Sequence, residues 1–193
     1  MSDWIQTFSG RRFWPLEPKP EDVCIEDIAH ALSMLCRYNG HCRIFYSVAE
    51  HSIHVQSIMA RTPIGKWDRQ LQLAALLHDA SEAYLADVPS PVKPYLIGYK
   101  EAEAKVMAAV HQAFGLEDPR NSEPFIKRID TRIRANEAEL LMPVESDPWH
   151  KVFGNPYALT IMCYEPAKAE TLFLEAAGAL LDGREHKEFP DVP

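Results

Sequence analysis

The residues best suited to chemistry are His78 and Asp79, two adjacent metal-ligand types that follow the apolar run at residues 71–77. Burying an imidazole beside a carboxylate is unfavourable unless each group finds a partner, and a divalent cation satisfies both. Glu82 lies at i+3 from Asp79 and i+4 from His78, so a continuous helix would turn all three toward one cavity. A hydrogen-bonded His–Asp pair at a helix end is the structural alternative.

Two other segments carry ligands of the same type. His51 lies in the first turn of a helix that a capping box predicts to begin at Ser47. Asp130 borders an apolar stripe of isoleucines at positions 126, 129 and 133, where an unpaired carboxylate would be destabilising. Helical bundles build metal sites from side chains on facing helices, so these residues and the His–Asp pair indicate a divalent metal site.

The elements that must position these residues are helices. Apolar residues recur with helical spacing, and alternating segments are nearly absent, which predicts an all-α helical bundle with a single domain over residues 1–193. Residues 1–23, rich in prolines and aromatic side chains, are expected to form an irregular arm that packs on the body, and residues 184–193 a frayed tail. The expected helices span about 25–36, 47–61, 66–84, 99–114, 124–141 and 165–181, and residues 159–163 are a candidate strand.

Composition narrows the class of protein. With 193 residues and 47% hydrophobic content, the chain suits one compact domain, and its net charge of −8 argues against coating a nucleic acid. No apolar run approaches the roughly 18 residues of a membrane span. The four cysteines form no C-x-x-C pair, so we expect reduced thiols and a cytoplasmic protein.

The order His51, His78-Asp79, Asp130 resembles the HD-domain metal-dependent phosphohydrolases. The segment from His78 to Lys93, which reads HDASE and then D-x-P-x-P-V-K, resembles bacterial 5′-deoxynucleotidases. The arm motif Gly-Arg-Arg-Phe-Trp-Pro-Leu and the Arg-Tyr-Asn-Gly-His motif at residues 37–41 resemble a phage-associated branch that includes deoxyadenosine triphosphate triphosphohydrolases. The resemblance covers about residues 10–140 and implies an HD-type bundle.

The resemblance also implies roles for individual residues. His51, His78, Asp79 and Asp130 would be the ligands of one divalent ion, for which Co, Mn, Zn, Fe, Ni and Mg are all candidates. Such an ion lowers the pKa of a bound water to about 7. Glu82 would orient or deprotonate that water, and an ordinary surface glutamate is the alternative.

Five further residues are candidates for contact with the substrate, and three of them, Asp87, Arg37 and Tyr38, match family positions that the resemblance places near it. Asp87 would act as an acid or contact the 3′-hydroxyl, although capping of the proline-rich turn is a rival role. Arg37 and Lys93 would contact phosphate, and Tyr38 would lie near the sugar or base. His41 is a further candidate, for which a bond to the backbone is the alternative. Lys127 and Arg43 are lesser candidates.

The expected activity is hydrolysis of a deoxyribonucleotide, most specifically a purine triphosphate such as dATP. A 5′-deoxynucleotidase that releases phosphate from monophosphates is the alternative enzyme, and a non-catalytic nucleotide-binding HD module is the alternative from another class. An iron-dependent HD oxygenase would need additional histidine ligands. The family resemblance further implies a homo-oligomer, while the acidic charge and the lack of a long apolar run predict that neither nucleic acid nor membrane is a partner.

Overall fold

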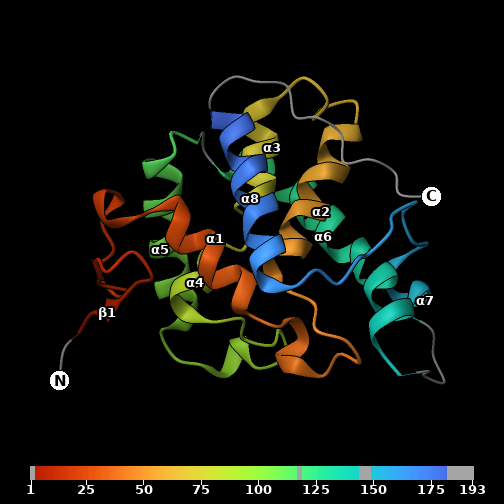
Figure 1. Ribbon diagram of the computed structural model, residues 1–193, viewed down its shortest axis with the longest axis horizontal. Helices are drawn as coiled ribbons and strands as arrows, with labels where there is room; N and C mark the ends of the chain where they lie inside the picture. Colours follow the sequence, from red (N-terminus) through yellow and green to blue (C-terminus); the bar gives the residue numbers. More distant parts are fainter. Residues whose placement is uncertain (1–2, 117–118, 144–148, 182–193) are drawn as a thin grey trace.

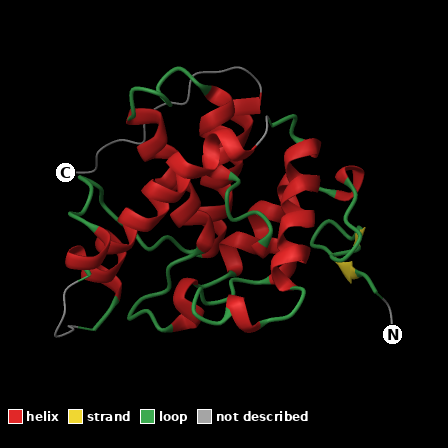
Figure 2. Cartoon of the chain, turned by 180° about the vertical axis from the view of Figure 1, so that it is seen from behind, coloured by secondary structure: helices red, strands yellow, loops and turns green. Residues whose placement is uncertain are grey.

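The computed structural model describes residues 3–116, 119–143 and 149–181, and the tail predicted at 184–193 lies outside these ranges. The described chain is helical apart from one small antiparallel sheet, so the all-α prediction is confirmed (Figures 1 and 2). The helices are α1 (Ile25–Met34), α2 (Val48–Arg61), α3 (Arg69–Leu76), α4 (Glu82–Leu85), α5 (Tyr99–Ala113), α6 (Pro119–Leu141), α7 (His150–Phe153) and α8 (Pro166–Leu181); the short 3-10 turns are η1 (Pro20–Asp22), η2 (Arg37–Gly40) and η3 (Lys93–Tyr95), and the strands are β1 (Ile5–Gln6) and β2 (Arg12–Phe13).

Two apolar clusters hold the bundle together. The larger one forms where α8 packs against α1, α2 and α3, and it contains the fully buried Ile28, Leu32 and Phe173 (Figure 1). The smaller one joins α2 and α3 to α6 and contains Met59 and Ile133. Because α2 and α3 contribute to both clusters, the connection that follows α3 is held between two packed layers.

The helix predicted over residues 66–84 is interrupted, which corrects the sequence-based expectation. Asp68 caps α3 by accepting a hydrogen bond from the Leu71 backbone N–H, and α3 then ends at Leu76. The chain turns through short i→i+3 bonds, including Glu82 N–H to Asp79 C=O, before α4 begins. His78 therefore lies in this turn, and the helical spacing used to place it beside Glu82 does not apply.

The N-terminal arm packs on the body, as its aromatic content predicts. Strands β1 and β2 pair in antiparallel register, and the buried ring of Phe13 stacks on Tyr84 with centroids 3.8 Å apart. The Asp27 carboxylate on α1 accepts hydrogen bonds from the backbone N–H and the hydroxyl of Ser9, at 2.6 and 2.8 Å. These contacts tie the arm to α1.

The candidate strand at 159–163 is not a strand. Backbone N–H groups at its end donate hydrogen bonds to a side chain and not to a neighbouring strand. The backbone N–H groups of Met162, Cys163 and Tyr164 donate to the buried Glu50 carboxylate at 2.8, 3.0 and 2.7 Å. Only one of the two hydrogen bonds of the predicted capping box is therefore formed. Ser47 accepts from the Glu50 N–H at 3.0 Å, as predicted, but the Glu50 side chain holds the segment before α8.

Helix α6 begins at Pro119, five residues before its predicted start, and it contains Pro124. Among the described helices, none combines the length and apolar character that crossing a membrane requires.

Candidate metal centre

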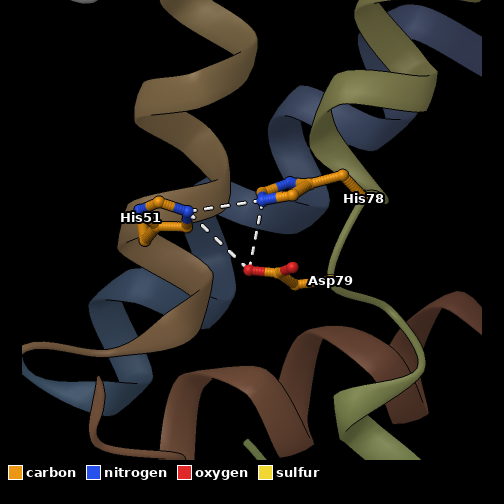
Figure 3. A group of neighbouring side chains, drawn as sticks. All are labelled: His51, His78 and Asp79. Carbon is orange, nitrogen blue, oxygen red and sulfur yellow. Dashed lines mark hydrogen bonds and ion pairs between the residues drawn. The ribbon is translucent and has the colours of Figure 1, made fainter. Parts of the chain in front are cut away.

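Three ligand atoms from two parts of the chain meet at one point in the bundle (Figure 3). The Nε2 atoms of His51 and His78 and the Oδ2 atom of Asp79 all lie within 4.8 Å of one another. The two Nε2 atoms are 3.3 Å apart, and Asp79 Oδ2 lies 3.1 Å from His78 and 3.7 Å from His51. His51 comes from α2 and the other two from the turn after α3, so tertiary packing assembles this group.

The other nitrogen of each histidine is already used as a donor. His51 Nδ1 lies 2.6 Å from the Glu137 carboxylate, and His78 Nδ1 lies 2.9 Å from the Ala75 carbonyl. Burial alone would raise the pKa of Glu137, but Arg37 and His51 outweigh it and lower that pKa to about 2. An ionised carboxylate and a carbonyl only accept hydrogen bonds, so both Nδ1 atoms carry protons. Neutral rings would then direct two Nε2 lone pairs at each other.

A fourth predicted ligand, Asp130 on α6, lies beside this group. Its Oδ1 atom is 3.4 Å from His51 Nε2, while Oδ2 accepts from Lys127 at 2.8 Å and Arg134 at 3.1 Å. Burial alone would raise the pKa of Asp130, but its bond to His51 and nearby positive charge outweigh burial and hold the pKa well below its usual range. The carboxylate is therefore anionic at neutral pH.

The donor set fits a divalent cation. The Nε2 lone pairs of two histidines and two carboxylates face one point, and a proton on His51 would give a hydrogen-bond donor to only some of these four groups. Burial and Arg37 would lower the pKa of His51, yet Glu137 and Asp130 outweigh both and raise it, so the surroundings of this ring favour positive charge. Mixed imidazole and carboxylate ligation suits Mn, Fe, Co, Ni or Zn.

Glu82 opens α4 and is buried, with 6% of its surface exposed. Its Oε1 atom lies 3.9 Å from Lys93 Nζ, and within the described residues Oε2 has no hydrogen-bond partner. Burial, and then the carboxylates of Asp79 and Asp87, raise the pKa of Glu82 to about 10. Asp87 is half-buried, and burial also raises its pKa. Both predicted catalytic residues thus lie in surroundings that favour proton binding.

Arg37 and Tyr38 of η2, the predicted phosphate and sugar contacts, also border the candidate metal centre. Arg37 Nη1 lies 3.6 Å from Asp79 Oδ2, and Arg37 Nη2 lies 3.3 Å from Glu137 Oε2. The Tyr38 hydroxyl donates to the same Glu137 oxygen, and burial raises the pKa of this phenol, so it stays protonated. His41 ends the turn and is exposed; in the described chain its side chain makes no hydrogen bond or ion pair with the other predicted site residues.

Sequence reasoning missed Glu137, although the signal was present. It lies seven residues after Asp130 on the same face of α6, close to Ile133, and is fully buried. A carboxylate beside an apolar stripe is the pattern that marks Asp130, and Glu137 shows the same pattern. Conversely, His54 lies at i+3 from His51, a spacing that would suit support of the ligand group, but its side chain pairs with Glu50 at 3.4 Å.

A cavity of about 790 Å³ opens beside the metal centre. His78, Asp79 and Asp130 line it, and side chains of α5 and α6, among them Met107 and Ile126, supply an apolar part. Its cationic lining consists of Lys93, Lys100 and Lys127. Lys93 is also bonded to Glu103 on α5 at 2.7 Å. The cavity is therefore large enough for a nucleotide-sized ligand and offers positive charge within it.

Comparison with known proteins gives relatives that are themselves described only as uncharacterized proteins. No protein-family model matches the chain. It is 42% identical over 158 residues to RCAP_rcc00048 of Rhodobacter capsulatus, covering 79% of this chain and 80% of that protein. It is 33% identical over 174 residues to YfdR of Escherichia coli, covering 89% and 92%. At this identity and coverage, the chain belongs to the same protein family as YfdR and RCAP_rcc00048.

Proposed function

We propose that this protein is an HD-type, metal-dependent phosphohydrolase whose substrate is a purine deoxynucleoside triphosphate such as dATP. The observation that carries the proposal is the meeting of two inward-facing Nε2 atoms with Asp79 and Asp130 at the wall of a lysine-lined cavity. A structural His–Asp pair needs neither the second histidine nor the cavity. The motif resemblance from His78 to Lys93 supports the same function.

Each residue of the site has its own role in the proposed reaction. His51, His78, Asp79 and Asp130 would hold a divalent ion, which supplies a Lewis acid for a phosphoryl oxygen and lowers the pKa of water. Glu82 would act as the base in its ionised form: burial beside other carboxylates raises its pKa, and the positive charge of a bound ion would oppose this and favour the ionised form. It would accept the proton of the attacking water.

The bond changes define the products. The water oxygen forms a bond to the α-phosphorus while the bond from phosphorus to the 5′-oxygen breaks. Asp87, whose pKa burial raises, would give a proton to the departing 5′-oxygen. The products are the deoxynucleoside and inorganic triphosphate; the proton taken up by Glu82 returns to solvent, and Asp87 takes up a proton from solvent.

The lysines support a triphosphate over a monophosphate. Lys93, Lys100 and Lys127 line one cavity, and the outer phosphates of a triphosphate would reach lysines of which two, Lys93 and Lys127, now pair with Glu103 and Asp130. The rival activity, release of phosphate from a deoxynucleoside monophosphate, is favoured by the resemblance of residues 78–93 to 5′-deoxynucleotidases. Homo-oligomer formation and a cytoplasmic location stay predictions.

The products formed from two substrates test the proposal. The purified chain is incubated with Mn²⁺ or Co²⁺ and either dATP or dAMP, and the phosphorus species are identified by ³¹P NMR; a chelator-treated sample is the control. We expect deoxyadenosine and triphosphate from dATP, with dAMP hydrolysed more slowly. Faster release of phosphate from dAMP would assign the 5′-deoxynucleotidase activity instead. Binding of either nucleotide without turnover would identify a non-catalytic module.

A further inference from the structure

One buried carboxylate connects the candidate metal centre to the η2 turn. Glu137 is fully buried on α6, and each of its oxygens is engaged. Oε1 accepts from His51 Nδ1 at 2.6 Å, and Oε2 accepts from Arg37 Nη2 at 3.3 Å and from the Tyr38 hydroxyl. The donors come from α2 and η2, far from Glu137 in sequence, so this side chain determines where three others lie.

The His51 contact controls which ring nitrogen faces the centre. Because Glu137 accepts the Nδ1 proton, the neutral ring presents its Nε2 lone pair toward His78 and Asp79 (Figure 3). Hydrogen-bond partners of this kind fix the tautomer and orientation of metal-binding histidines, and their loss typically lowers metal affinity about 10–100-fold.

The contacts of η2 stabilise a backbone conformation that its residues rarely adopt. Tyr38 and Asn39 have φ values of +56° and +51°, in the left-handed region that non-glycine residues avoid. Each such residue is unfavourable, so surrounding contacts must offset it. Glu137 engages both Arg37 and Tyr38, and Arg37 in turn lies 3.6 Å from Asp79. The turn is thereby held against the ligand group.

We propose that Glu137 is a positioning residue that couples the two halves of the site: it orients His51 for a divalent ion, and it holds Arg37 and Tyr38, to which the motif resemblance gives the phosphate and sugar contacts. The nucleotide half rests on the proposed function, whereas the ion half does not. Three donors surround the Glu137 carboxylate, so we propose no direct contact between Glu137 and the substrate. Its removal should weaken ion and nucleotide binding together.

The test compares three variants of the full chain. Glu137→Gln keeps the shape but loses the charge, and its amide group cannot accept all three hydrogen bonds. Tyr38→Phe removes one donor and leaves His51 untouched. Glu139→Gln is the matched control, because it makes the same substitution at an exposed position of the same helix. Glu137→Asp, which withdraws the carboxylate by one methylene, replaces Glu137→Gln if circular dichroism shows that the latter does not fold.

Two measurements separate positioning from a general structural effect. Titration with Co²⁺, followed in the visible absorption spectrum, should show about 10–100-fold weaker binding and an altered spectrum for Glu137→Gln only. Calorimetric titration with dATP, in a Glu82→Gln background that prevents turnover, should show weaker binding for Glu137→Gln. Tyr38→Phe should bind dATP about 2–10-fold more weakly with unchanged Co²⁺ affinity, as expected for one lost hydrogen bond.

Each outcome has a defined meaning. Wild-type Co²⁺ affinity and spectrum in Glu137→Gln overturn the inference and leave the proposed function standing. Weaker Co²⁺ binding with unchanged dATP binding overturns the coupling. A wild-type chain that binds no divalent ion overturns the proposed function together with the inference.

Discussion

Two histidines that both donate from Nδ1 leave their Nε2 atoms 3.3 Å apart, and two lone pairs at that distance repel each other unless a cation lies between them. In the metal-free state, Glu137 and Asp130 raise the pKa of His51 against burial and Arg37, and the proposed ion would displace a proton bound there. At residue scale, the proposed divalent ion would therefore compete with protons for two nitrogens and two carboxylates.

His78→Ala tests the donor set. Removing one nitrogen from the group should lower Co²⁺ or Mn²⁺ affinity by more than the roughly 10–100-fold expected for the loss of a hydrogen-bond partner behind a ligand, and activity should fall with it. Isothermal titration with the metal measures the effect. His150→Ala, at an exposed position of α7, is the control and should bind the ion normally. Unchanged affinity in His78→Ala would remove this residue from the ligand set.

Glu82→Gln tests the proposed base. The amide keeps the size of the side chain but cannot accept the proton of the attacking water, so kcat should fall about 10²–10⁴-fold. Ion affinity should stay within a few-fold of the wild type, since Glu82 is not a member of the ligand group. Steady-state rates with dATP and metal titration give both quantities. Wild-type turnover in this variant would exclude Glu82 from the mechanism.

At the scale of elements, the connection between α2 and α3 constrains how α3 packs on α2, and with it the position of His78 relative to His51. Gly65 lies in this connection, and a Cβ added there would come within 2.2 Å of the Met59 backbone oxygen. The Gly65 carbonyl also accepts from the buried Gln72 side chain of α3 at 2.7 Å. A shift of this turn would therefore be transmitted to α3 and to the His78–Asp79 turn that follows it.

Gly65→Ala should destabilise the fold by about 1–3 kcal/mol, as overpacking typically does, because the clash is with backbone that cannot rotate away. Urea unfolding followed by circular dichroism measures the change. Gly178→Ala in α8 is the contrasting substitution: nothing lies within 4 Å of its added Cβ, so the better helix propensity should stabilise by about 0.5–1 kcal/mol. Equal stabilities for the two variants would contradict the assigned packing of the α2–α3 connection.

At the scale of the whole molecule, the candidate centre joins elements that belong to both apolar clusters. Its residues come from α2, the turn after α3, and α6, and the helices meet there with carboxylates and imidazoles instead of apolar side chains. Arg37 lies beside Asp79 and Glu137, and Asp130 accepts from Lys127 and Arg134, so the ligand residues are already tied to their neighbours in the fold. An ion that binds only the folded chain should therefore stabilise the entire bundle.

Addition of Mn²⁺ or Co²⁺ at about 100 times its Kd should stabilise the folded state by about 2.7 kcal/mol. For a domain of this size, that corresponds to a rise in Tm of about 5–11 °C. Thermal unfolding with and without the ion measures the shift, and EDTA should reverse it. His78→Ala should show no such shift. An identical shift in His78→Ala would mean that the ion binds elsewhere.

The sequence alone determined the class of fold and most of the candidate residues. Helical periodicity depends on which side chains face inward, a local property, so α1, α2, α5 and α8 begin and end close to their predicted residues. Ligand types within apolar surroundings are also a local pattern, which is why the sequence by itself singles out His51, His78, Asp79 and Asp130. The interruption after Leu76 left no such mark, because no glycine or proline lies between residues 66 and 84.

Only the tertiary structure decided which atoms meet. The distance between His51 and His78 follows from the packing of α2 on α3, and the role of Glu137 depends on its reaching α2 and η2 across the bundle. Glu50 likewise has the spacing of a capping box and instead holds residues 162–164. A carboxylate can satisfy its hydrogen bonds locally or at long range, and the sequence does not encode this choice until packing excludes water and leaves one set of donors within reach.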